Sequence, residues 1–130
     1  LCQYARHLGL AFQIQDDLLD ITAAADELGK PIGGDVMEGK RTWLVVQSLE
    51  RATSPQDRQL LARFLSNKGL PPEDVPAMRE LYQRNGVIDA AQEEVRLHTE
   101  RAESELQHLP EGEARQMLAW FTQMLLNRRF

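Results

Sequence analysis

The chain has 130 residues, with 15 Lys and Arg against 20 Asp and Glu, so its formal net charge is -5 at pH 7. This acidic balance argues against a general nucleic-acid binder, because phosphate binding needs a basic field. Hydrophobic residues make up 42% of the sequence, which is enough for a core and too much for a chain that is disordered by composition. The length predicts one domain over residues 1–130.

The cysteine content and the lengths of the apolar runs indicate the cellular compartment. Cys2 is the only cysteine, which excludes an intrachain disulfide and a cysteine-based zinc site and favours a reducing compartment. No apolar run approaches the roughly 18 residues of a membrane helix, and no signal-peptide pattern is present. We therefore expect a soluble, cytoplasmic protein without stable membrane insertion. The chain begins at Leu1 in the middle of an apolar pattern, which indicates part of a longer protein.

Helical periodicity dominates the first half of the chain. Residues 1–25 contain no proline and repeat apolar residues at helical spacing, which predicts a long first helix. Residues 28–41 are rich in glycine, and we expect neither helix nor strand there. The apolar residues of 43–51 do not alternate with polar ones, so this stretch favours a buried helix over a strand.

Further helices are predicted in the second half. Ser54, Pro55 and Asp57 have the spacing of an N-cap, a first-turn proline and a capping box, so a helix should begin there and end before Gly69. Apolar stripes predict three more helices, from Val75 to Tyr82, Ile88 to Leu109 and Glu113 to Leu125. No β-hairpin signal occurs. The pattern predicts an all-α fold of about six helices joined by short turns.

Several residues have structural interpretations. We expect Tyr82 to pack between helices, and His98 to be a hydrogen-bonded core histidine because it falls on an apolar stripe. The Glu-rich stretch 93–105 is predicted to face solvent. Trp120, Phe121 and the methionines of the last helix are interpreted as core residues.

The acidic residues of the first helix are the sharpest chemical feature. Gln13, Asp16, Asp17 and Asp20 share one face, within an arc of about 100°. Carboxylates this close repel one another, and no Lys or Arg at the next turn neutralises them. A bound cation would offset this repulsion. Oxygen ligands suit Mg²⁺, which takes one or two carboxylates plus substrate phosphates.

A solvated acidic face is the competing interpretation, and it is the commoner one for an isolated DDxxD. Phe12, Ile14, Leu18 and Leu19 cover the other faces of this helix, which indicates burial on most sides. Carboxylates on a buried helix must face a cavity or an ion, so the functional interpretation is favoured.

The glycine-rich segment supplies basic groups. Lys30, Asp35 and Lys40 lie among glycines that permit close backbone approach, and two ammonium groups there can bind diphosphate oxygens. The spacing matches neither a Walker A loop nor a dinucleotide fingerprint. A flexible surface loop is the alternative. Because the segment follows an acidic helix that is predicted to bind a cation, a phosphate-binding role is favoured for it.

GLAFQIQDDLLD from Gly9 to Asp20, followed by LGKPIGGDVMEGKRT from Leu28 to Thr42, resembles the second aspartate-rich region of the trans-isoprenyl diphosphate synthases. This family contains farnesyl, geranylgeranyl and longer polyprenyl diphosphate synthases. The remaining helices match it only in pattern and length. The resemblance implies an antiparallel helical bundle of the isoprenoid synthase type, with residues 1–130 as its C-terminal part.

The resemblance also implies an activity, that of a prenyltransferase. An allylic diphosphate is ionised with the help of Mg²⁺, and the allylic cation alkylates the double bond of isopentenyl diphosphate in a head-to-tail condensation. Proton loss then gives the elongated allylic diphosphate. The intact enzyme is expected to be a homodimer.

Residue roles follow by position in the motifs. The resemblance assigns the Mg²⁺ site to Asp16, Asp17 and Asp20, with Asp16 as a direct ligand and Asp17 supporting through water or from behind the direct ligands. Phe12 and Gln13 belong to the substrate cavity in this assignment, and Gln13 lies beside the reacting end of the allylic substrate.

The diphosphate-binding roles fall on the glycine-rich segment. The resemblance implies that Lys30 binds the departing diphosphate and that Lys40 and Asp35 support the same charge network. Asp16, Lys30 and Gln13 are therefore the expected catalytic residues.

Departures from the family pattern limit these expectations. The first aspartate-rich motif, the isopentenyl diphosphate site and the residues that limit product length belong to an upstream half that this chain lacks. We therefore expect the 130 residues alone to be inactive, and to self-associate or be poorly stable because apolar surface is exposed. Trp43-Leu44 stands where many bacterial members have Leu-Pro, which leaves the subfamily open.

Two other functions compete with the prenyltransferase. A non-catalytic helical interaction module is one, but such a relative would be expected to have lost Asp16, Asp20 or Lys30, and all three are present. A class I terpene cyclase is the other. It is disfavoured because such cyclases normally carry an NSE/DTE-type motif in place of the second DDxxD.

Overall fold

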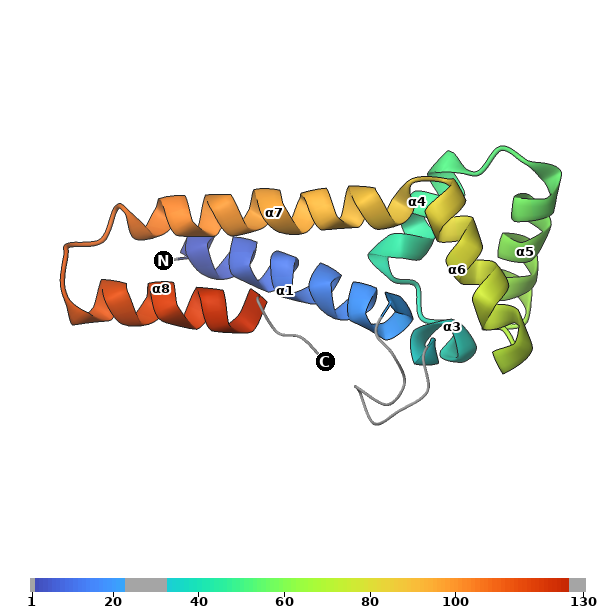
Figure 1. Cartoon of the computed structure of the whole chain (residues 1–130), viewed down its shortest axis with the longest axis horizontal. Coiled ribbons are helices and arrows are strands. Elements are labelled where there is room, and N and C mark those ends of the chain that lie inside the picture. Colours follow the sequence, from blue (N-terminus) through green and yellow to red (C-terminus); the bar gives the residue numbers. More distant parts are fainter. Residues whose placement is uncertain (1, 23–32, 127–130) are drawn as a thin grey trace. The chain divides into compact units, whose positions relative to one another are not determined.

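The computed structural model describes residues 2–22 and 33–126, and the regular structure of these residues is entirely helical. The helices, shown in Figure 1, are α1 (Cys2–Thr22), α3 (Gly34–Glu38), α4 (Trp43–Arg51), α5 (Pro55–Ser66), the 3₁₀ turn η1 (Pro72–Asp74), α6 (Val75–Arg84), α7 (Val87–Leu106) and α8 (Glu113–Leu126). The all-α prediction is confirmed. The predicted end of the first helix, near residue 25, lies outside the described residues. No helix in the described part is long and apolar enough to cross a membrane.

The helix α3 corrects the prediction for the glycine-rich segment. Residues Gly34–Glu38 are helical, and Gly33 and Gly39 flank them with left-handed φ values of 84° and 75°. The glycines therefore cap a short helix instead of breaking it, since only glycine adopts such φ values without steric cost. Glycine content alone does not separate the capping positions from the ordinary residues between them.

Two side-chain caps begin the next helices. The Oγ1 of Thr42 accepts from the backbone N of Val45 at 3.4 Å and starts α4. The Oγ of Ser54 accepts from the N of Asp57 at 3.1 Å and starts α5, so the predicted N-cap is confirmed.

The capping-box role of Asp57 is wrong. Its carboxylate accepts instead from Arg84 Nη2 at 2.5 Å and from Asn85 Nδ2 at 3.0 Å. A charged partner from the end of α6 competes successfully with the local backbone for this carboxylate. The Asp57 side chain, in the first turn of α5, thus ties this helix to the end of α6.

Cα packing divides the chain into two compact units, residues 16–91 and residues 1–15 with 92–129. In the unit of residues 16–91, the core comes from α1, α4, α5 and α6, and the largest fully buried side chains include Tyr82, Phe64, Ile21, Leu44, Met78 and Leu81. Tyr82 is 1% exposed, which confirms that it packs between helices. This core supports the end of α1, where the carboxylates lie.

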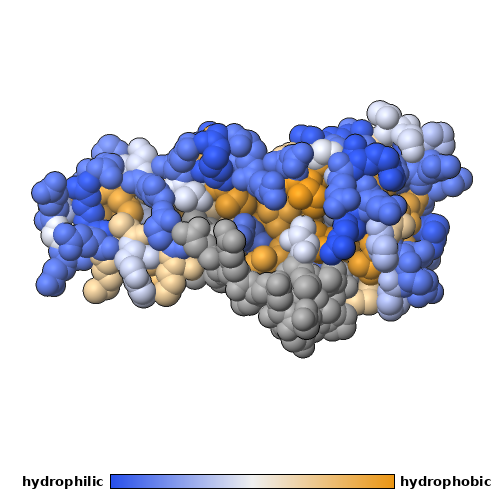
Figure 2. Space-filling model, viewed as in Figure 1, coloured by the Kyte–Doolittle hydropathy of each residue, from blue (hydrophilic) through white to orange (hydrophobic). Residues whose placement is uncertain are grey.

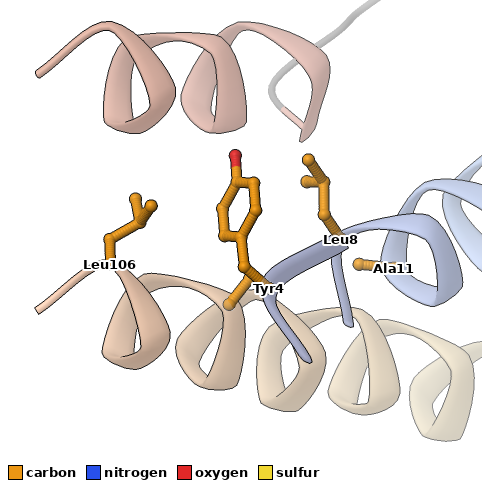
Figure 3. Packing of buried hydrophobic residues seen from close by; sticks show 5 residues of the cluster. Tyr4, Leu8, Ala11 and Leu106 are labelled. Atoms are coloured by element: carbon orange, nitrogen blue, oxygen red, sulfur yellow. The ribbon is translucent and has the colours of Figure 1, made fainter. Parts of the chain in front are cut away.

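The other unit is built from the first part of α1, most of α7, and α8. Figure 1 shows α7 and α8 as an antiparallel pair. Tyr4, Leu8 and Ala11 of α1 pack with Ala102 and Leu106 of α7, and the Tyr4 ring points toward α8 in Figure 3. The Tyr4 hydroxyl donates to the carbonyl of Leu118 at 3.2 Å and lies 2.6 Å from the Oγ1 of Thr122. One tyrosine therefore connects α1 with α8 by both packing and hydrogen bonds.

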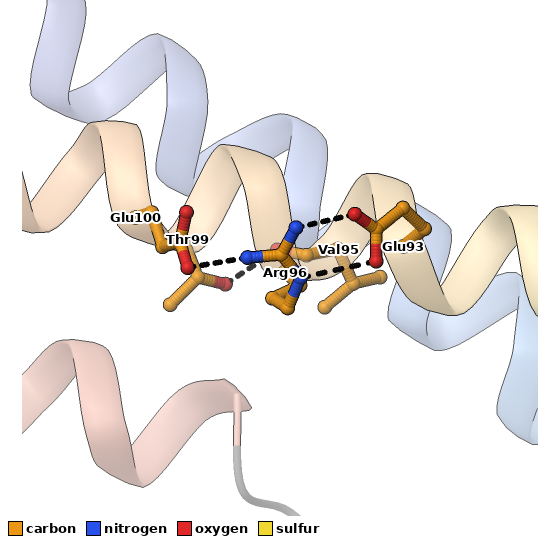
Figure 4. A network of polar contacts seen from close by, with 5 residues as sticks. All are labelled: Glu93, Val95, Arg96, Thr99 and Glu100. Carbon is orange, nitrogen blue, oxygen red and sulfur yellow. Dashed lines mark hydrogen bonds and ion pairs between the residues drawn. The ribbon is translucent and has the colours of Figure 1, made fainter.

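The polar side of α7 faces solvent, as predicted. Arg96 pairs with Glu93 and with Glu100, and Figure 4 shows all three on one side of the helix. His98 has a side chain that is 13% exposed, and its Nδ1 lies 3.1 Å from the Nδ1 of His7. The prediction of a hydrogen-bonded histidine is confirmed, but His98 is only partly buried and is not a core residue.

The apolar residues of α8 correct a second prediction. Met117, Trp120, Phe121 and Met124 are 66%, 63%, 40% and 47% exposed, so they are not core residues in this chain. Figure 2 shows apolar surface along α8, whereas α7 presents hydrophilic surface in the same view. The helix packs through its other side, where Thr122 is fully buried. Periodicity showed that α8 has an apolar face but could not show whether anything covers it.

Candidate active site

The last turns of α1 carry the acidic motif into a largely buried setting. Asp17 is 4% exposed and Asp20 6%, although both are carboxylates. Burial of a carboxylate is costly unless partners compensate it, so their contacts matter. Asp16 and Gln13 are exposed on the same helix.

Asp20 is bound to the segment that follows the acidic motif. Its Oδ2 accepts from the N of Asp35 at 3.0 Å, and its backbone carbonyl accepts from the N of Gly33 at 2.7 Å. These two bonds fix the start of α3 on the end of α1. The glycine-rich segment is therefore attached to the acidic helix by backbone groups.

Lys40 lies between two carboxylates. Its Nζ is 3.6 Å from Asp17 Oδ1 and 3.9 Å from Asp35 Oδ2. The Lys40 side chain is 45% exposed, whereas the side chain of Asp17 is 3% exposed. The ammonium group thus stands at the surface above a buried carboxylate, where it can reach a ligand.

Neighbouring charges shift the pKa values of both Lys40 and Asp35. Burial lowers the pKa of Lys40, but the carboxylates of Asp35 and Asp17 outweigh it, so the pKa is raised above the usual lysine value. The pKa of Asp35 is also raised, first by burial and then by the charge of Asp20, although Lys40 opposes the change. Negative charge therefore prevails around Asp35 even with the ammonium group in place.

Tyr82 supports the site although no sequence motif includes it, whereas its partner Thr42 is the last residue of the second motif. Burial raises the pKa of the Tyr82 hydroxyl, and the charges of Asp35, Asp17 and Asp20 raise it further, while a hydrogen bond with Thr42 opposes this shift. The tyrosine thus lies within electrostatic reach of the carboxylates and stays neutral. No local sequence signal marks such a residue.

Arg79 is a second residue that the motifs did not indicate. It lies on α6, and its Nε and Nη2 donate to the carbonyl oxygen of Ile21 at 2.9 and 2.7 Å. Ile21 directly follows Asp20, so Arg79 holds the turn that carries the motif. The two residues are 58 positions apart in sequence, which is why helical periodicity could not predict their contact.

The structure thus brings together Asp17, Asp20, Asp35 and Lys40, which were predicted from two separate stretches of sequence. Lys30 lies outside the described residues. Phe12 is half-buried and lines an apolar hollow of about 410 Å³ together with Tyr4, Leu8, Gly9, Leu118 and Phe121. The substrate-cavity roles of Phe12 and Gln13 remain predictions.

The donor groups fit a hard divalent cation. Within residues 2–22 and 33–126, no group of three or more His, Cys, Asp or Glu side chains is arranged to hold a metal ion by itself. Mg²⁺ does not require such a cage, because it keeps several waters and binds one or two carboxylates together with substrate phosphates. Asp16 is exposed, so its carboxylate oxygens are accessible, and the negative charges of Asp16, Asp17 and Asp20 act together on Asp35.

Comparison with known proteins identifies the family to which this chain belongs. Residues 1–83 match the polyprenyl synthetase family model, and the chain belongs to that family. The resemblance drawn from the motifs is therefore confirmed.

Individual relatives and solved structures agree. The chain is 40% identical over 126 residues to the short chain isoprenyl diphosphate synthase of Methanothermobacter thermautotrophicus, covering 96% of this chain and 38% of the relative. The geranylgeranyl pyrophosphate synthetase of Pyrococcus horikoshii superimposes with a TM-score of 0.86 at 32% identity, over 98% of this chain and 38% of that one. The polyprenyl synthase of Caulobacter crescentus, complexed with calcium and isoprenyl diphosphate, superimposes with a TM-score of 0.82 at 30% identity, over 98% of this chain and 39% of that one.

These matches show an isoprenyl diphosphate synthase fold. They also show that the chain spans about 38% of the length of the curated relatives that it matches.

Proposed function

We propose that this chain is the part of a trans-isoprenyl diphosphate synthase that binds the divalent cation and the diphosphate of the allylic substrate. The observation that carries the proposal is Lys40, whose Nζ lies 3.6 Å from Asp17 and 3.9 Å from Asp35 beside the acidic turns of α1. An ammonium group that is held at the surface by a buried carboxylate and a partly exposed one is suited to bind the oxygens of a metal-bound diphosphate. The complete enzyme would condense an allylic diphosphate with isopentenyl diphosphate, head to tail.

In this proposal the exposed Asp16 holds the cation directly and Asp20 contributes to the same site. Mg²⁺, when bound, neutralises the charge that develops on the departing diphosphate. The cation would be Mg²⁺ because the donors are carboxylate oxygens on a rigid helix. The calcium and isoprenyl diphosphate in the Caulobacter crescentus structure support a divalent cation and a diphosphate in this family.

Lys40 would donate to oxygens of the allylic diphosphate as its C–O bond breaks. Asp17 holds the ammonium group in place, and Asp35 shares that task from the other side. A cation fixed where negative charge develops lowers the barrier, since no reorganisation is needed during the reaction. Lys30 would bind the same diphosphate.

Gln13 and Phe12 would lie beside the allylic chain. Gln13 is exposed on α1, one turn before Asp16 on the same face, so its amide can meet the carbon end of a substrate whose diphosphate lies at the carboxylates. The second substrate, isopentenyl diphosphate, would be bound by the part of the enzyme outside these residues. The whole enzyme is proposed to be a cytoplasmic homodimer.

The test is an assay of the complete protein that contains these residues. It is given isopentenyl diphosphate, Mg²⁺ and one of dimethylallyl, geranyl, farnesyl or geranylgeranyl diphosphate. Product that is formed by the natural sequence and lost in Asp16→Ala supports the proposal and gives the product length. Glu111→Ala, a change at an exposed carboxylate of the α7–α8 connection, is the matched control and should retain activity.

Failure with every primer, in a folded protein, would contradict the proposal and favour a non-catalytic helical module. The 130 residues alone are expected to be inactive in the same assay, because they contain only part of the proposed substrate sites.

A further inference from the structure

The turn that follows α5 lies against α3, although neither sequence motif includes it. The backbone N of Leu70 donates to the carbonyl of Val36 at 3.1 Å, which bonds the turn to α3. The N of Gly69 donates to the carbonyl of Phe64 at 2.9 Å, which bonds the turn to α5. Val36, Phe64 and Leu70 are each at most 3% exposed, so the junction is dry and closely packed.

The two backbones lie close together at a pair of glycines, Gly39 and Gly69. A Cβ at Gly69 would overlap the carbonyl oxygen of Met37 and lie 2.9 Å from the N of Gly39. A Cβ at Gly39 would overlap the carbonyl of Lys68 and lie 2.8 Å from the N of Gly69. These neighbours are backbone atoms, so neither position can accept a side chain unless one segment moves.

This contact bears on Lys40, which directly follows Gly39. The backbone N of Lys40 donates to the carbonyl of Asp35 at 2.9 Å, so its main chain is tied to α3. The carboxylate of Asp17 belongs to α1, whose end is bonded to the start of α3 through Asp20 and to α6 through Arg79. A shift of the other end of α3, at Gly39, would therefore change the position of the Lys40 ammonium group relative to Asp17.

We infer that the turn formed by Lys68, Gly69 and Leu70 is a positioning element for Lys40. The backbone contact between Gly39 and Gly69 sets where the ammonium group stands over Asp17, and hence how well it meets the diphosphate of the allylic substrate. The inference rests on the proposed function, in which Lys40 binds that diphosphate. The side chains of the turn do not touch the substrate.

Gly69→Ala in the complete protein tests the inference. The added methyl group displaces α3, so we expect kcat/KM for the allylic diphosphate to fall about 10- to 100-fold, with a rise in its KM. Gly86→Ala is the matched control. Gly86 also has a positive φ, of 70°, but its added Cβ would meet only the end of the Arg51 side chain, at 3.5 Å. The control places a side chain at a positive φ without the backbone overlap, so it should lose less thermal stability than Gly69→Ala and keep the natural KM.

Lys68→Gly separates the backbone from the side chain. Lys68 has a φ of 53°, which glycine adopts freely, so this variant keeps the turn and removes the ammonium group. We expect an unchanged KM. A raised KM would instead show that Lys68 itself binds diphosphate, and the inference would be overturned.

Lys68→Val covers the case in which Gly69→Ala does not fold. A β-branched residue disfavours positive φ, so it moves the turn without adding an atom to the glycine contact. It should raise the KM in the same sense as Gly69→Ala.

A binding measurement gives a readout besides activity. Calorimetric titration with inorganic diphosphate and Mg²⁺ should show weaker binding to Gly69→Ala than to Gly86→Ala. Equal affinity and equal KM for these two folded variants would overturn the inference while leaving the proposed function intact. If the natural protein neither binds diphosphate nor transfers a prenyl group, the proposed function itself has failed.

Discussion

Arg79 donates from both Nε and Nη2 to the carbonyl oxygen of Ile21, so an arginine of α6 binds the main chain of α1 directly after Asp20. A hydrogen bond from a charged donor is stronger than one between neutral groups. Since Ile21 follows Asp20, this contact fixes the turn that carries the acidic motif. The orientation of the carboxylates therefore depends on a residue outside that motif.

Arg79→Ala should lower the free energy of unfolding by about 2 kcal/mol, because a hydrogen bond from a charged group to a partly buried carbonyl contributes about 1.5–3 kcal/mol. Arg79→Lys should recover only part of the loss, since an ammonium group cannot reproduce the paired donors of the guanidinium fork. Urea denaturation measures both. Arg115→Ala, at an arginine bonded to Gln107 on the surface, is the control and should change stability by less than about 0.5 kcal/mol. Equal effects at Arg79 and Arg115 would show that the contact of Arg79 with Ile21 does not stabilise the fold.

Asp57 makes the chain less stable at acidic pH. The hydrogen bond from Arg84 holds the pKa of this carboxyl below its usual value, and burial opposes it only in part. The folded state thus prefers the ionised form. The stabilisation is present above the unfolded-state pKa of about 3.9 and is lost as the pH falls through the lower folded-state value.

Asp57→Asn should remove this dependence and lower the melting temperature by several degrees at pH 7. Calorimetry from pH 7 down to about pH 3 follows both effects. The matched variant is Asp89→Asn, on α7, which should keep the acid-side slope. An unchanged slope in Asp57→Asn would contradict the assignment.

The site shows which features a sequence can predict. The shared face of Asp16, Asp17 and Asp20 follows from 3.6 residues per turn, and the caps at Thr42 and Ser54 follow from side-chain chemistry next to their own helices. These features are local, so the chain within a few residues determines them. The spacing of the family motif also relates Lys40 and Asp35 to the acidic helix.

The features that escaped prediction depend on segments far apart in sequence. The role of Arg79 requires the position of α6 relative to the end of α1, and the contact of Gly39 with Gly69 requires the turn after α5. Composition showed that glycine was abundant, but it could not show which backbone segment lies close to each glycine. The exposure of Trp120 escaped prediction for the same reason, because a helix pattern cannot show what lies opposite it.

The histidine pair adds a second pH dependence, at and below the usual histidine pKa of about 6.5. Burial lowers the pKa of His7, and so do the charges of His98, Arg101 and Arg6, while Glu105 opposes them. The Nδ1 atoms of His7 and His98 are 3.1 Å apart, a contact that needs one donor and one acceptor. Glu94 lies 3.4 Å from the other nitrogen of His98. Protonation of both rings at Nδ1 would break their hydrogen bond.

Because the folded-state pKa of His7 is lowered, its contribution to stability is present above the unfolded-state value of about 6.5 and is lost as the pH falls through the folded-state value. His7→Gln should reduce the slope of melting temperature against pH in this window. His108→Gln, at an exposed histidine, should leave it unchanged. Identical slopes for the two variants would exclude the pair as the source.

The exposed apolar face of α8 should make the free chain self-associate. Met117, Trp120, Phe121 and Met124 are all at least 40% exposed, and contiguous apolar surface of this kind promotes association in water. Sedimentation velocity should show a weight-average coefficient that rises with concentration. Replacing Met117 and Trp120 with Gln should weaken this rise, whereas Leu10→Gln on α1 serves as a single-site comparison. A sharp monomer at every concentration would refute the prediction.

Lys40→Met provides the most direct test of the charge arrangement in the complete enzyme. The change keeps much of the side-chain volume but removes the ammonium group that stands 3.6 Å from Asp17 and 3.9 Å from Asp35. The diphosphate then loses a cationic partner, and the carboxylates lose theirs. We expect kcat/KM for the allylic diphosphate to fall by about 10²–10³, the usual cost of removing a group that stabilises developing charge.

Lys40→Arg keeps the positive charge but not the compact shape, so it should recover part of the activity. Lys68→Met is the matched control, since it removes a lysine from the neighbouring turn without changing the charge between Asp17 and Asp35. If Lys40→Met and Lys68→Met have the same kinetics, the position of Lys40 between the carboxylates has no catalytic consequence. A loss confined to Lys40→Met would instead tie transfer to that one ammonium group.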